Sequence, residues 1–389
     1  MENYYFVNWV DGMKLNRTHF EAEENALINR MRKSLSTLTQ SFSYGLLPPR
    51  GGDGPLRMKL EIDRAQLLRI QVSECHAVTP GGVVIDIKPQ YQHDQMKEVG
   101  GMLSEVSLAS LNNGRSYYVA LTVHPFRKRP VGEQDPNDAP PRLPFSDYYY
   151  DITLVPADDP ALFENGLFHL AISKFTVRTN GIEIDEHYIP PCTSCLSHPD
   201  LAEVARDLGS VLTKMETRCV GIISSIFEKN QTAELPATVL YLLEKILAFL
   251  SVNIPLYRNQ AAESSPLFLL NLVSGLARVV KNAIDSKGRA GKEEMLNYFR
   301  SWIVDVSQGE FEEIVDHMVN LEYRHSDINL SLKSILSFCN TLSTILKKLD
   351  ELEFIGDKKL KQGPVIDVRK KVDVDVQPQK PVKRSFLAE

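Results

Sequence analysis

The sequence predicts an α+β multidomain chain, in which an N-terminal antiparallel β-sandwich is followed by a helical bundle and a short C-terminal tail. Short segments that alternate between apolar and polar residues fill positions 46 to about 191, and turn residues rather than helices separate them. Beyond them, apolar residues recur every three or four positions over long segments, as in packed helices. A chain of 389 residues is long enough for two or three domains with cores of their own.

The chain opens on a strongly apolar stretch. Its first ten residues hold the aromatic and β-branched side chains that favour an extended strand: Tyr4, Tyr5, Phe6, Val7, Trp9 and Val10. Asp11-Gly12 then predicts a tight reversal, because glycine accepts a positive φ. Since tryptophan and tyrosine dominate interface hot spots, we expect this arm to bind a partner protein.

A helix is expected after the reversal. Thr18 is the predicted N-cap, with Glu21 completing a capping box, and Gly45 is the predicted stop signal. One apolar seam runs along this helix through Leu27, Met31, Leu35, Leu38 and Phe42, and its simplest interpretation is a helix packed in the core. On these signals we assign residues 1–45 to an N-terminal arm and helix.

Residues 46–191 form the predicted β-sandwich domain. Strands are expected at residues 56–62, 68–72, 83–87, 117–123, 148–155, 167–177 and 182–184. Pro80-Gly81-Gly82 and Asn180-Gly181 are the expected hairpin turns. The segment 127–144 is rich in Pro, Asp and Asn and predicts a long exposed loop.

Residues 192–353 form the predicted helical bundle. Helices are expected to begin near Pro199, Pro236 and Pro266, with shorter ones over 295–304 and 311–318, and a last long helix capped by Asp327. The segment 267–280 is apolar on several sides, which predicts burial in a bundle or in a homotrimer. Residues 354–389 form a charged tail; a flexible tail and an arm that orders on a partner both remain open for it.

Composition excludes several classes of function. A net charge of −6 does not favour nucleic-acid binding, and no continuous apolar run predicts insertion into a membrane. The first residues lack the pattern of a signal peptide, and five cysteines do not make a disulfide framework. We therefore expect a cytoplasmic protein.

No catalytic or cofactor motif is present. Cys192 and Cys195, with His198 nearby, lack the second pair of ligands that a zinc site needs, so we expect no metal there. His325 beside Asp327 could form a catalytic dyad, but capping explains Asp327 more simply. We expect no enzyme activity.

The order of certain residues in the opening stretch resembles the TssK family, baseplate subunits of the bacterial type VI secretion system. The pattern comprises Val7, Trp9, Asp11, Gly12, Met13, Leu15, His19 and Phe20. Three further segments are similar to family motifs in the same order: Tyr188 to Pro191, Pro266 to Leu270, and Tyr323, His325 and Asp327. The acidic position is Asp11 rather than the family's usual Glu.

This resemblance implies a β-sandwich shoulder, a helical-bundle neck and a homotrimer in contact with TssF- and TssG-like wedge proteins. It implies a non-enzymatic structural subunit, recruited to the inner face of the cytoplasmic membrane, that links the wedge to the membrane-associated complex. After the predicted neck only residues 354–389 remain, so we expect the family's head domain, which docks onto that complex, to be reduced or absent, and the link stays open. The partner-binding candidates are Tyr4, Tyr5, Phe6, Val7, Trp9, Asp11, Gly12, Met13, Leu15, His19 and Phe20.

An alternative is a trimeric, phage-type receptor-binding protein, with a ligand-binding β-sandwich on a helical stalk. Such a protein would expose aromatic side chains at loop tips beside acidic and amide groups. A baseplate subunit would instead keep the aromatic arm available to a protein partner.

Overall fold

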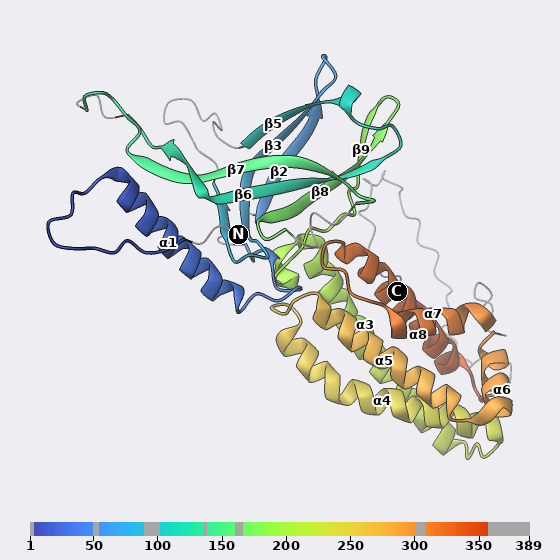
Figure 1. Ribbon diagram of the computed structural model, residues 1–389. Helices are drawn as coiled ribbons and strands as arrows, with labels where there is room; N and C mark the ends of the chain where they lie inside the picture. Colours follow the sequence, from blue (N-terminus) through green and yellow to red (C-terminus); the bar gives the residue numbers. More distant parts are fainter. Residues whose placement is uncertain are drawn as a thin grey trace, which may run out of the picture. The chain divides into compact units, whose positions relative to one another are not determined.

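The computed structural model describes residues 4–49, 54–88, 102–134, 138–159, 166–300 and 308–356. The chain forms two compact units (Figure 1). Unit 1 comprises Met1–Ala202 together with two later segments, Glu263–Leu267 and Arg324–Asn329. Unit 2 comprises Glu203–Ala262, Phe268–Tyr323 and Leu330–Glu389. The predicted tail lies outside the described residues from position 357 onwards.

The first sheet of unit 1 is built around one long strand. It contains β1 (Gly45–Leu46), β2 (Leu56–Ile62), β3 (Leu67–Val78), β4 (Val84–Ile87) and β5 (Met102–Ser107), and β3 pairs antiparallel with the other four. Leu68, Ile70 and Val72 of β3 are fully buried. The predicted hairpin between β3 and β4 is confirmed, with Gly82 in its turn at a φ of +76°.

The second sheet has the order β7-β6-β8-β9 and is also antiparallel. Its strands are β6 (Ser116–Val131), β7 (Phe145–Pro156), β8 (His169–Arg178) and β9 (Gly181–Ile184), and β5 of the first sheet contacts β7. The hairpin predicted at Asn180-Gly181 is confirmed. The loop predicted over 127–144 is wrong at its start, because β6 continues to Val131, which pairs with Phe145.

Gly45 joins the start of the first sheet to the end of the β region. Its φ is +113°, the amide of Leu46 donates to the carbonyl of Pro191 at 2.7 Å, and β1 bridges to Cys192. The prediction that Gly45 ends the N-terminal helix is wrong: that helix, α1 (Arg17–Ser36), ends nine residues earlier. The positive φ serves a close backbone contact instead of a helix stop.

The motif residues near 188 and 325 meet inside unit 1. The hydroxyl of Tyr188 donates to the carbonyl of Ser326 at 3.0 Å, and Nε2 of His325 lies 2.8 Å from the carbonyl oxygen of Tyr44. Lys174 of β8 forms an ion pair with Asp327, with 3.4 Å between Nζ and Oδ2. Segment 324–329 is therefore held to unit 1 by hydrogen bonds and charge.

Unit 2 is helical. Its helices are α3 (Pro199–Glu228), α4 (Glu234–Gln260), α5 (Leu267–Asp285), α6 (Gly288–Arg300), α7 (Gln308–Asn320) and α8 (Ile328–Glu351), and the first residues of α3, α5 and α8 belong to unit 1. The core includes the fully buried side chains of Met215, Leu243, Val273 and Phe338. Nine residues of α5 are buried within the single chain, so its apolar character does not by itself require a second copy.

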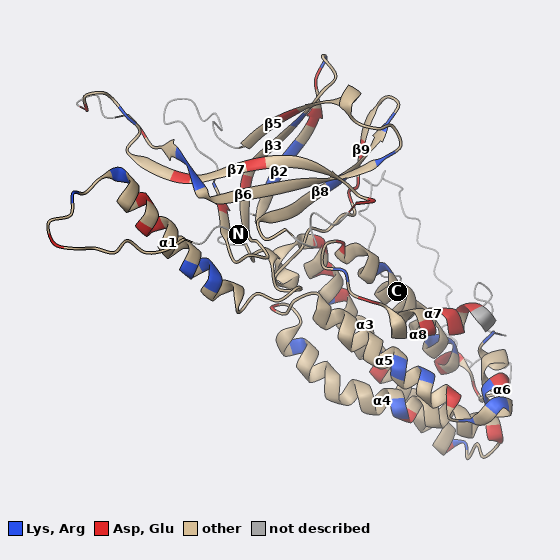
Figure 2. Cartoon of the chain, viewed as in Figure 1, with Lys and Arg blue, Asp and Glu red and all other residues tan. Residues whose placement is uncertain are grey.

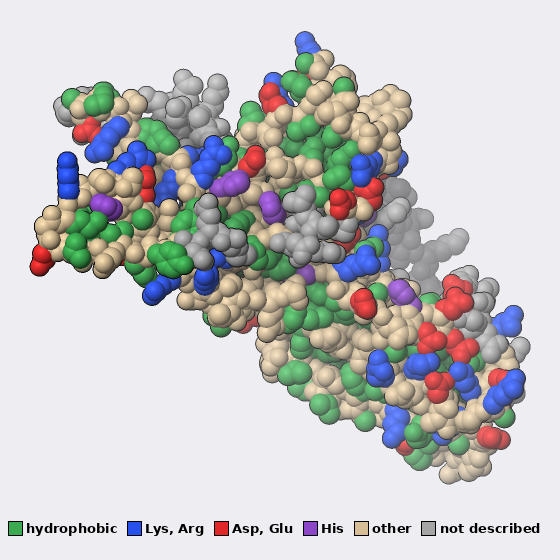
Figure 3. Space-filling model, in the orientation of Figure 1, with side chains coloured by type: hydrophobic (Ala, Val, Ile, Leu, Met, Phe, Trp, Pro, Cys, Tyr) green, Lys and Arg blue, Asp and Glu red, His purple; other side chains and the backbone are tan. Residues whose placement is uncertain are grey.

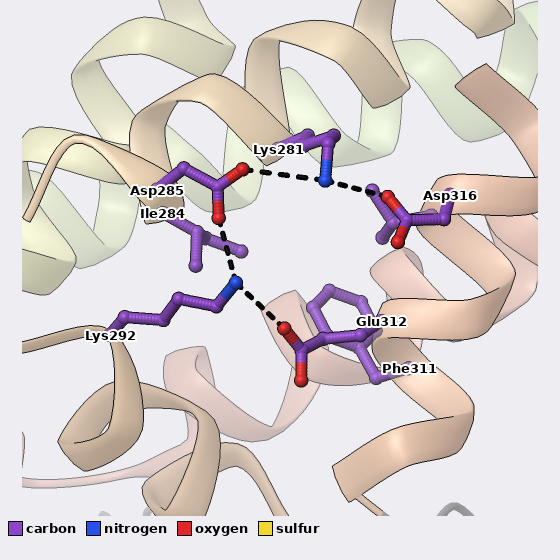
Figure 4. A pocket seen from close by; sticks show the side chains of 8 residues that line it. Lys281, Ile284, Asp285, Lys292, Phe311, Glu312 and Asp316 are labelled. Atoms are coloured by element: carbon purple, nitrogen blue, oxygen red, sulfur yellow. Dashed lines mark hydrogen bonds and ion pairs between the residues drawn. The ribbon is translucent and has the colours of Figure 1, made fainter. Parts of the chain in front are cut away.

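A chain of ion pairs links α5, α6 and α7 beside a small pocket (Figure 4). Lys281 contacts Asp285 at 3.3 Å and Asp316 at 2.7 Å, while Lys292 contacts Asp285 and Glu312, both at 2.8 Å. The hydrogen bond to Asp285 is the largest of several effects that raise the pKa of Lys292. Because each lysine joins two carboxylates on different helices, this network stabilises the arrangement of the three helices.

Two helices, α4 and α5, are long and apolar enough to cross a membrane by length and composition. That is weak evidence, because the core helices of soluble proteins reach the same hydropathy. Both helices bury apolar residues inside the folded chain.

Candidate partner-binding surface

The N-terminal arm, residues 4–15, lies against α1 and β6 of unit 1. The ring of Tyr4 stacks on Phe126 with 3.9 Å between centroids, and the guanidinium of Arg30 lies 4.2 Å from the centroid of the Phe6 ring. The amide of Val7 donates to a carboxylate oxygen of Glu23 at 2.9 Å. The arm is extended, but the predicted strand is wrong, because residues 4–10 join neither sheet.

Other side chains of the arm face outwards. Tyr5 is 75% exposed and Trp9 is 45% exposed, and Val10 and Leu15 are exposed as well. The predicted reversal at Asp11-Gly12 is confirmed, with a φ of +76° at Gly12. The ring of Trp9 lies 6.2 Å from His19 and 6.3 Å from Phe20, so the turn brings the arm back to the start of α1.

The candidate residues thus divide into two groups. Tyr4, Phe6, Val7, Met13 and His19 are partly buried, whereas Tyr5, Trp9, Asp11, Gly12, Leu15 and Phe20 are exposed. Within the partly buried group, Tyr4, Phe6 and Val7 hold the arm to β6 and α1 through the contacts described above.

Helix α1 begins two residues earlier than the predicted capping box implies. Its N-cap is Asn16, whose side-chain oxygen accepts from the amide of His19 at 3.2 Å, so the prediction of Thr18 is wrong. Thr18 instead donates its hydroxyl to the side chain of Asn16 at 2.6 Å. Glu21 pairs with Arg17 at 2.6 Å one helical turn away. Asparagine caps helices as well as threonine does, so sequence alone did not separate the two.

The burial of α1 is the reverse of what its apolar seam predicts. The residues buried on this helix are Ala26, Asn29 and Arg32. The exposed side chains include most of the seam: Leu27, Met31, Leu35 and Leu38, with only Phe42 partly buried beyond the helix. Hydrophobic side chains gather over the arm and α1, at the left of Figure 3. A seam expected in the core therefore forms an apolar surface.

Polar contacts hold α1 in this orientation. Glu24 forms an ion pair with Lys128 of β6, and charged residues of both signs occur along the helix (Figure 2). The buried guanidinium of Arg32 donates to Asn29 at 2.9 Å and lies 5.4 Å from the centroid of Phe168. A Cβ built on Gly82 would come within 2.8 Å of the carbonyl oxygen of Arg32, so the turn after β3 presses closely on the helix. Sequence periodicity did not reveal this orientation of α1, because the pattern locates an apolar face on the helix but not the residues that pack against that face.

The candidate metal ligands are buried. Cys192 and Cys195 are fully buried, burial raises the pKa of Cys195 to about 12, and Sγ of Cys192 lies 3.2 Å from the carbonyl oxygen of Pro190. Burial also lowers the pKa of His198. Within the part of the chain that the structure describes, no three His, Cys, Asp or Glu side chains come together as a metal site.

The structure gives no support to a catalytic dyad of His325 and Asp327. His325 lies close to the backbone carbonyl of Tyr44, and Asp327 forms an ion pair with Lys174.

No protein-family model matches the chain, and no curated protein matches it. Several solved structures match the chain. A chain of the baseplate complex from the type VI secretion system matches with a TM-score of 0.50 at 14% identity, over 89% of this chain and 100% of that one. A crystal structure of TssK matches with a TM-score of 0.44 at 15% identity, over 89% of this chain and 69% of that one. A cryo-electron microscopy structure of a TssK-TssF-TssG baseplate subcomplex matches with a TM-score of 0.43 at 14% identity, over 88% and 99%.

At sequence identities this low, the similarity concerns the fold alone. The fold assignment rests on the match to the baseplate complex, which has a TM-score of 0.50. The chain has the fold of a subunit of that complex. The resemblance predicted from four short motifs is thus confirmed at the level of the fold.

Proposed function

We propose that this chain, whose fold is that of a type VI baseplate subunit, is a divergent TssK-like structural protein without enzyme activity. In this proposal the two antiparallel sheets of residues 46–191 form a sandwich shoulder, and the helices of residues 192–353 form a bundle neck. Three copies associate, and the assembly acts in the cytoplasm at the inner face of the membrane. The fold likeness supports this assignment and lends no support to a phage-type receptor-binding protein.

The arm is the proposed contact with the TssF- and TssG-like wedge proteins. The observation that carries this is the division of its side chains: Tyr4 and Phe6 are anchored by ring and cation contacts, while Tyr5 and Trp9 face solvent beside them. An anchored backbone costs little entropy on binding, and exposed Trp and Tyr side chains are the residues that supply most binding energy at interfaces.

A pull-down of co-expressed wedge proteins with Trp9→Ala tests the proposal. Loss of a buried tryptophan at an interface costs on the order of 2 kcal/mol or more, which is about a thirtyfold weaker complex. Phe227→Ala is the matched control, because Phe227 is another exposed aromatic residue, on α3 of unit 2. We expect it to retain the wedge proteins.

A melting curve of each variant completes the experiment. Because Trp9 is 45% exposed, Trp9→Ala should leave the melting temperature of the free protein nearly unchanged. If it lowers that temperature strongly, or if the wedge proteins remain bound, the arm serves the core of unit 1 and is not the wedge contact.

A further inference from the structure

An open groove lies between α7 and α8 of unit 2, and we call it the α7–α8 groove. Its volume is about 350 Å³. Nε2 of His317 on α7 lies 3.0 Å from Oγ of Ser334 on α8, so the two helices are in contact there. Most of the surface that lines the groove is apolar, and the lining includes Ile314. A groove of this volume can hold a few side chains of a bound segment.

The α7 side of the groove is acidic. Four of the thirteen residues of α7 are Asp or Glu and none is Lys or Arg, as the red segments of this helix in Figure 2 show. Two of these four pair with lysines of α5 and α6, as described above. The other two, Glu310 and Glu313, are exposed and line the groove. Lys333 lines the α8 side, so the groove has carboxylates on one side and an ammonium on the other.

Residues 357–389 of the tail have the complementary chemistry. They hold nine lysine and arginine residues against five aspartate and glutamate residues. The run Arg369-Lys370-Lys371 is followed at once by alternating valine and aspartate over 372–376. In an extended segment this alternation puts the valines on one side. Such a segment offers cations to the glutamates of α7, valines to the apolar lining and carboxylates to the lysine of α8.

The tail is long enough to reach the groove within one chain. The amide of Gly356, the last described residue, donates to the hydroxyl of Tyr298 on α6 at 3.0 Å, and residues 357–389 follow from there. Along α8, the seventeen steps from Ser334 to Glu351 rise about 26 Å. The thirteen steps from Gly356 to Arg369 span up to about 43 Å when extended.

We propose that residues 369–376 of the tail dock in the α7–α8 groove of their own chain and stabilise the packing of the two helices. A tethered segment acts at an effective concentration on the order of millimolar, so contacts too weak to hold a free peptide are sufficient. Its own tail is therefore the occupant that the groove favours over another protein. The inference concerns contacts within one chain, so it does not depend on the baseplate assignment.

Limited digestion with trypsin tests the docking, because trypsin cuts after lysine and arginine and acts on the undocked form of a segment. A synthetic peptide of residues 357–389 gives the intrinsic cleavage rate at each site. We expect cleavage at residues 369–371 to be on the order of tenfold slower in the full chain than in the peptide. Cleavage at residues 383–384, outside the docking segment, should be nearly as fast in the chain as in the peptide.

Charge-neutral variants of α7 show whether the groove is the docking site. Glu310→Gln/Glu313→Gln removes two ion pairs to the tail and should speed cleavage at residues 369–371 on the order of tenfold. Glu203→Gln/Glu244→Gln is the matched control, because it changes two exposed glutamates on α3 and α4. It should leave the cleavage pattern unchanged. If both double variants behave as the wild type does, the tail does not dock on α7.

A disulfide tests the position of the tail. All five cysteines of the chain are buried, so thiols introduced by Ser337→Cys in the groove and Val374→Cys in the tail are easily distinguished from them. We expect mild oxidation to link these two thiols within one chain. Val252→Cys, at an exposed position of α4, combined with Val374→Cys is the control and should give no link. A link between two chains instead of within one would contradict docking in the chain's own groove.

Two further outcomes would overturn the inference. One is equal cleavage at residues 369–371 in the full chain and in the peptide. The other is protection of these sites only when vesicles that contain phosphatidylserine are added, which would make the cationic run a lipid-binding segment. Since none of these measurements involves the wedge proteins, either outcome leaves the baseplate assignment standing, and the wedge pull-down tests that assignment separately.

Discussion

At the scale of single residues, Gly45 has the tightest surroundings of the glycines that the structure describes. A Cβ on this residue would lie 2.0 Å from the carbonyl oxygen of Pro191, and its φ of +113° disfavours any side chain. Backbone atoms cannot move aside as a flexible side chain can. The start of the first sheet and the end of the β region therefore depend on the absence of a side chain here.

We expect Gly45→Ala to lower the free energy of unfolding of unit 1 by about 3 kcal/mol or more, from backbone strain together with the clash. Gly114→Ala is the matched control, because Gly114 has a φ of +80° but open space around it. It should cost only ~1 kcal/mol, from strain alone. Chemical denaturation measures both, and equal losses would show that the contact with Pro191 is unimportant.

We expect His325 to make unit 1 sensitive to acid. Burial lowers its pKa from 6.5 to about 4, against the opposing effect of its hydrogen bond to the Tyr44 carbonyl. Above pH 6.5 the imidazole is neutral in both states, so it adds no pH dependence. As the pH falls from about 6.5 to about 4, the unfolded state takes up the proton first, and stability is lost.

The free energy of unfolding should therefore fall by up to about 3 kcal/mol across that window through His325, since one pKa unit corresponds to about 1.4 kcal/mol. His325→Gln should flatten this part of the stability profile, because glutamine can donate a hydrogen bond but does not titrate there. Denaturation curves between pH 4 and 7 give the answer. An unchanged slope in the variant would assign the acid sensitivity to other groups.

At the scale of elements, α1 shows that the orientation of an amphipathic helix is decided by its surroundings. Its polar face meets β6 and the turn after β3, and its apolar face meets solvent in the single chain. Such an arrangement is stable only if the polar face makes good contacts and the apolar face finds a partner. The ion pair of Glu24 with Lys128 is a further contact between α1 and β6.

Glu24→Lys should loosen α1, because it places two lysines together in place of an ion pair. Half-exposed pairs contribute up to about 1 kcal/mol, so amide hydrogen exchange in α1 should become a few times faster. The exchanged pair Glu24→Lys/Lys128→Glu should restore slow exchange. If the double variant exchanges as fast as Glu24→Lys, charge is not what holds this part of the helix.

At the scale of the whole molecule, the chain consists of two units with separate cores. Unit 1 has buried β-sheet residues such as Ile70, and unit 2 has buried helix residues such as Met295. Two cores need not unfold as one. We expect calorimetry to resolve two transitions, one for each unit.

Single substitutions should identify these transitions. Met295→Ala should cost about 2–5 kcal/mol through the cavity that it leaves, and should lower the transition of unit 2. Gly45→Ala should lower the temperature of the unit 1 transition. If both substitutions shift one common transition by similar amounts, the two units unfold as a single cooperative structure.

The sequence by itself determined the class of the fold and most of its elements. Alternation located β2, β4 and β7, three-to-four-residue spacing located α3, α5 and α8, and the turns at Gly12, Gly82 and Asn180-Gly181 are where the pattern placed them. These are local properties, since the period of a pattern and the φ that a residue tolerates depend on neighbours in the chain. The strands β1 and β5 were missed, because one has only two residues and the other does not alternate strictly between apolar and polar residues.

Only the tertiary structure decided which surfaces are covered. Periodicity identified the seam of Leu27, Met31 and Leu35 but predicted that it lies in the core. It also suggested that α5 packs in an oligomer, although the single chain buries nine residues of that helix. It could not show that Gly45 meets Pro191 or that His325 meets Tyr44, because those partners lie 146 and 281 residues apart in the chain. Burial is set by such distant residues, so a helical pattern shows that an apolar face exists while the fold determines what lies against it.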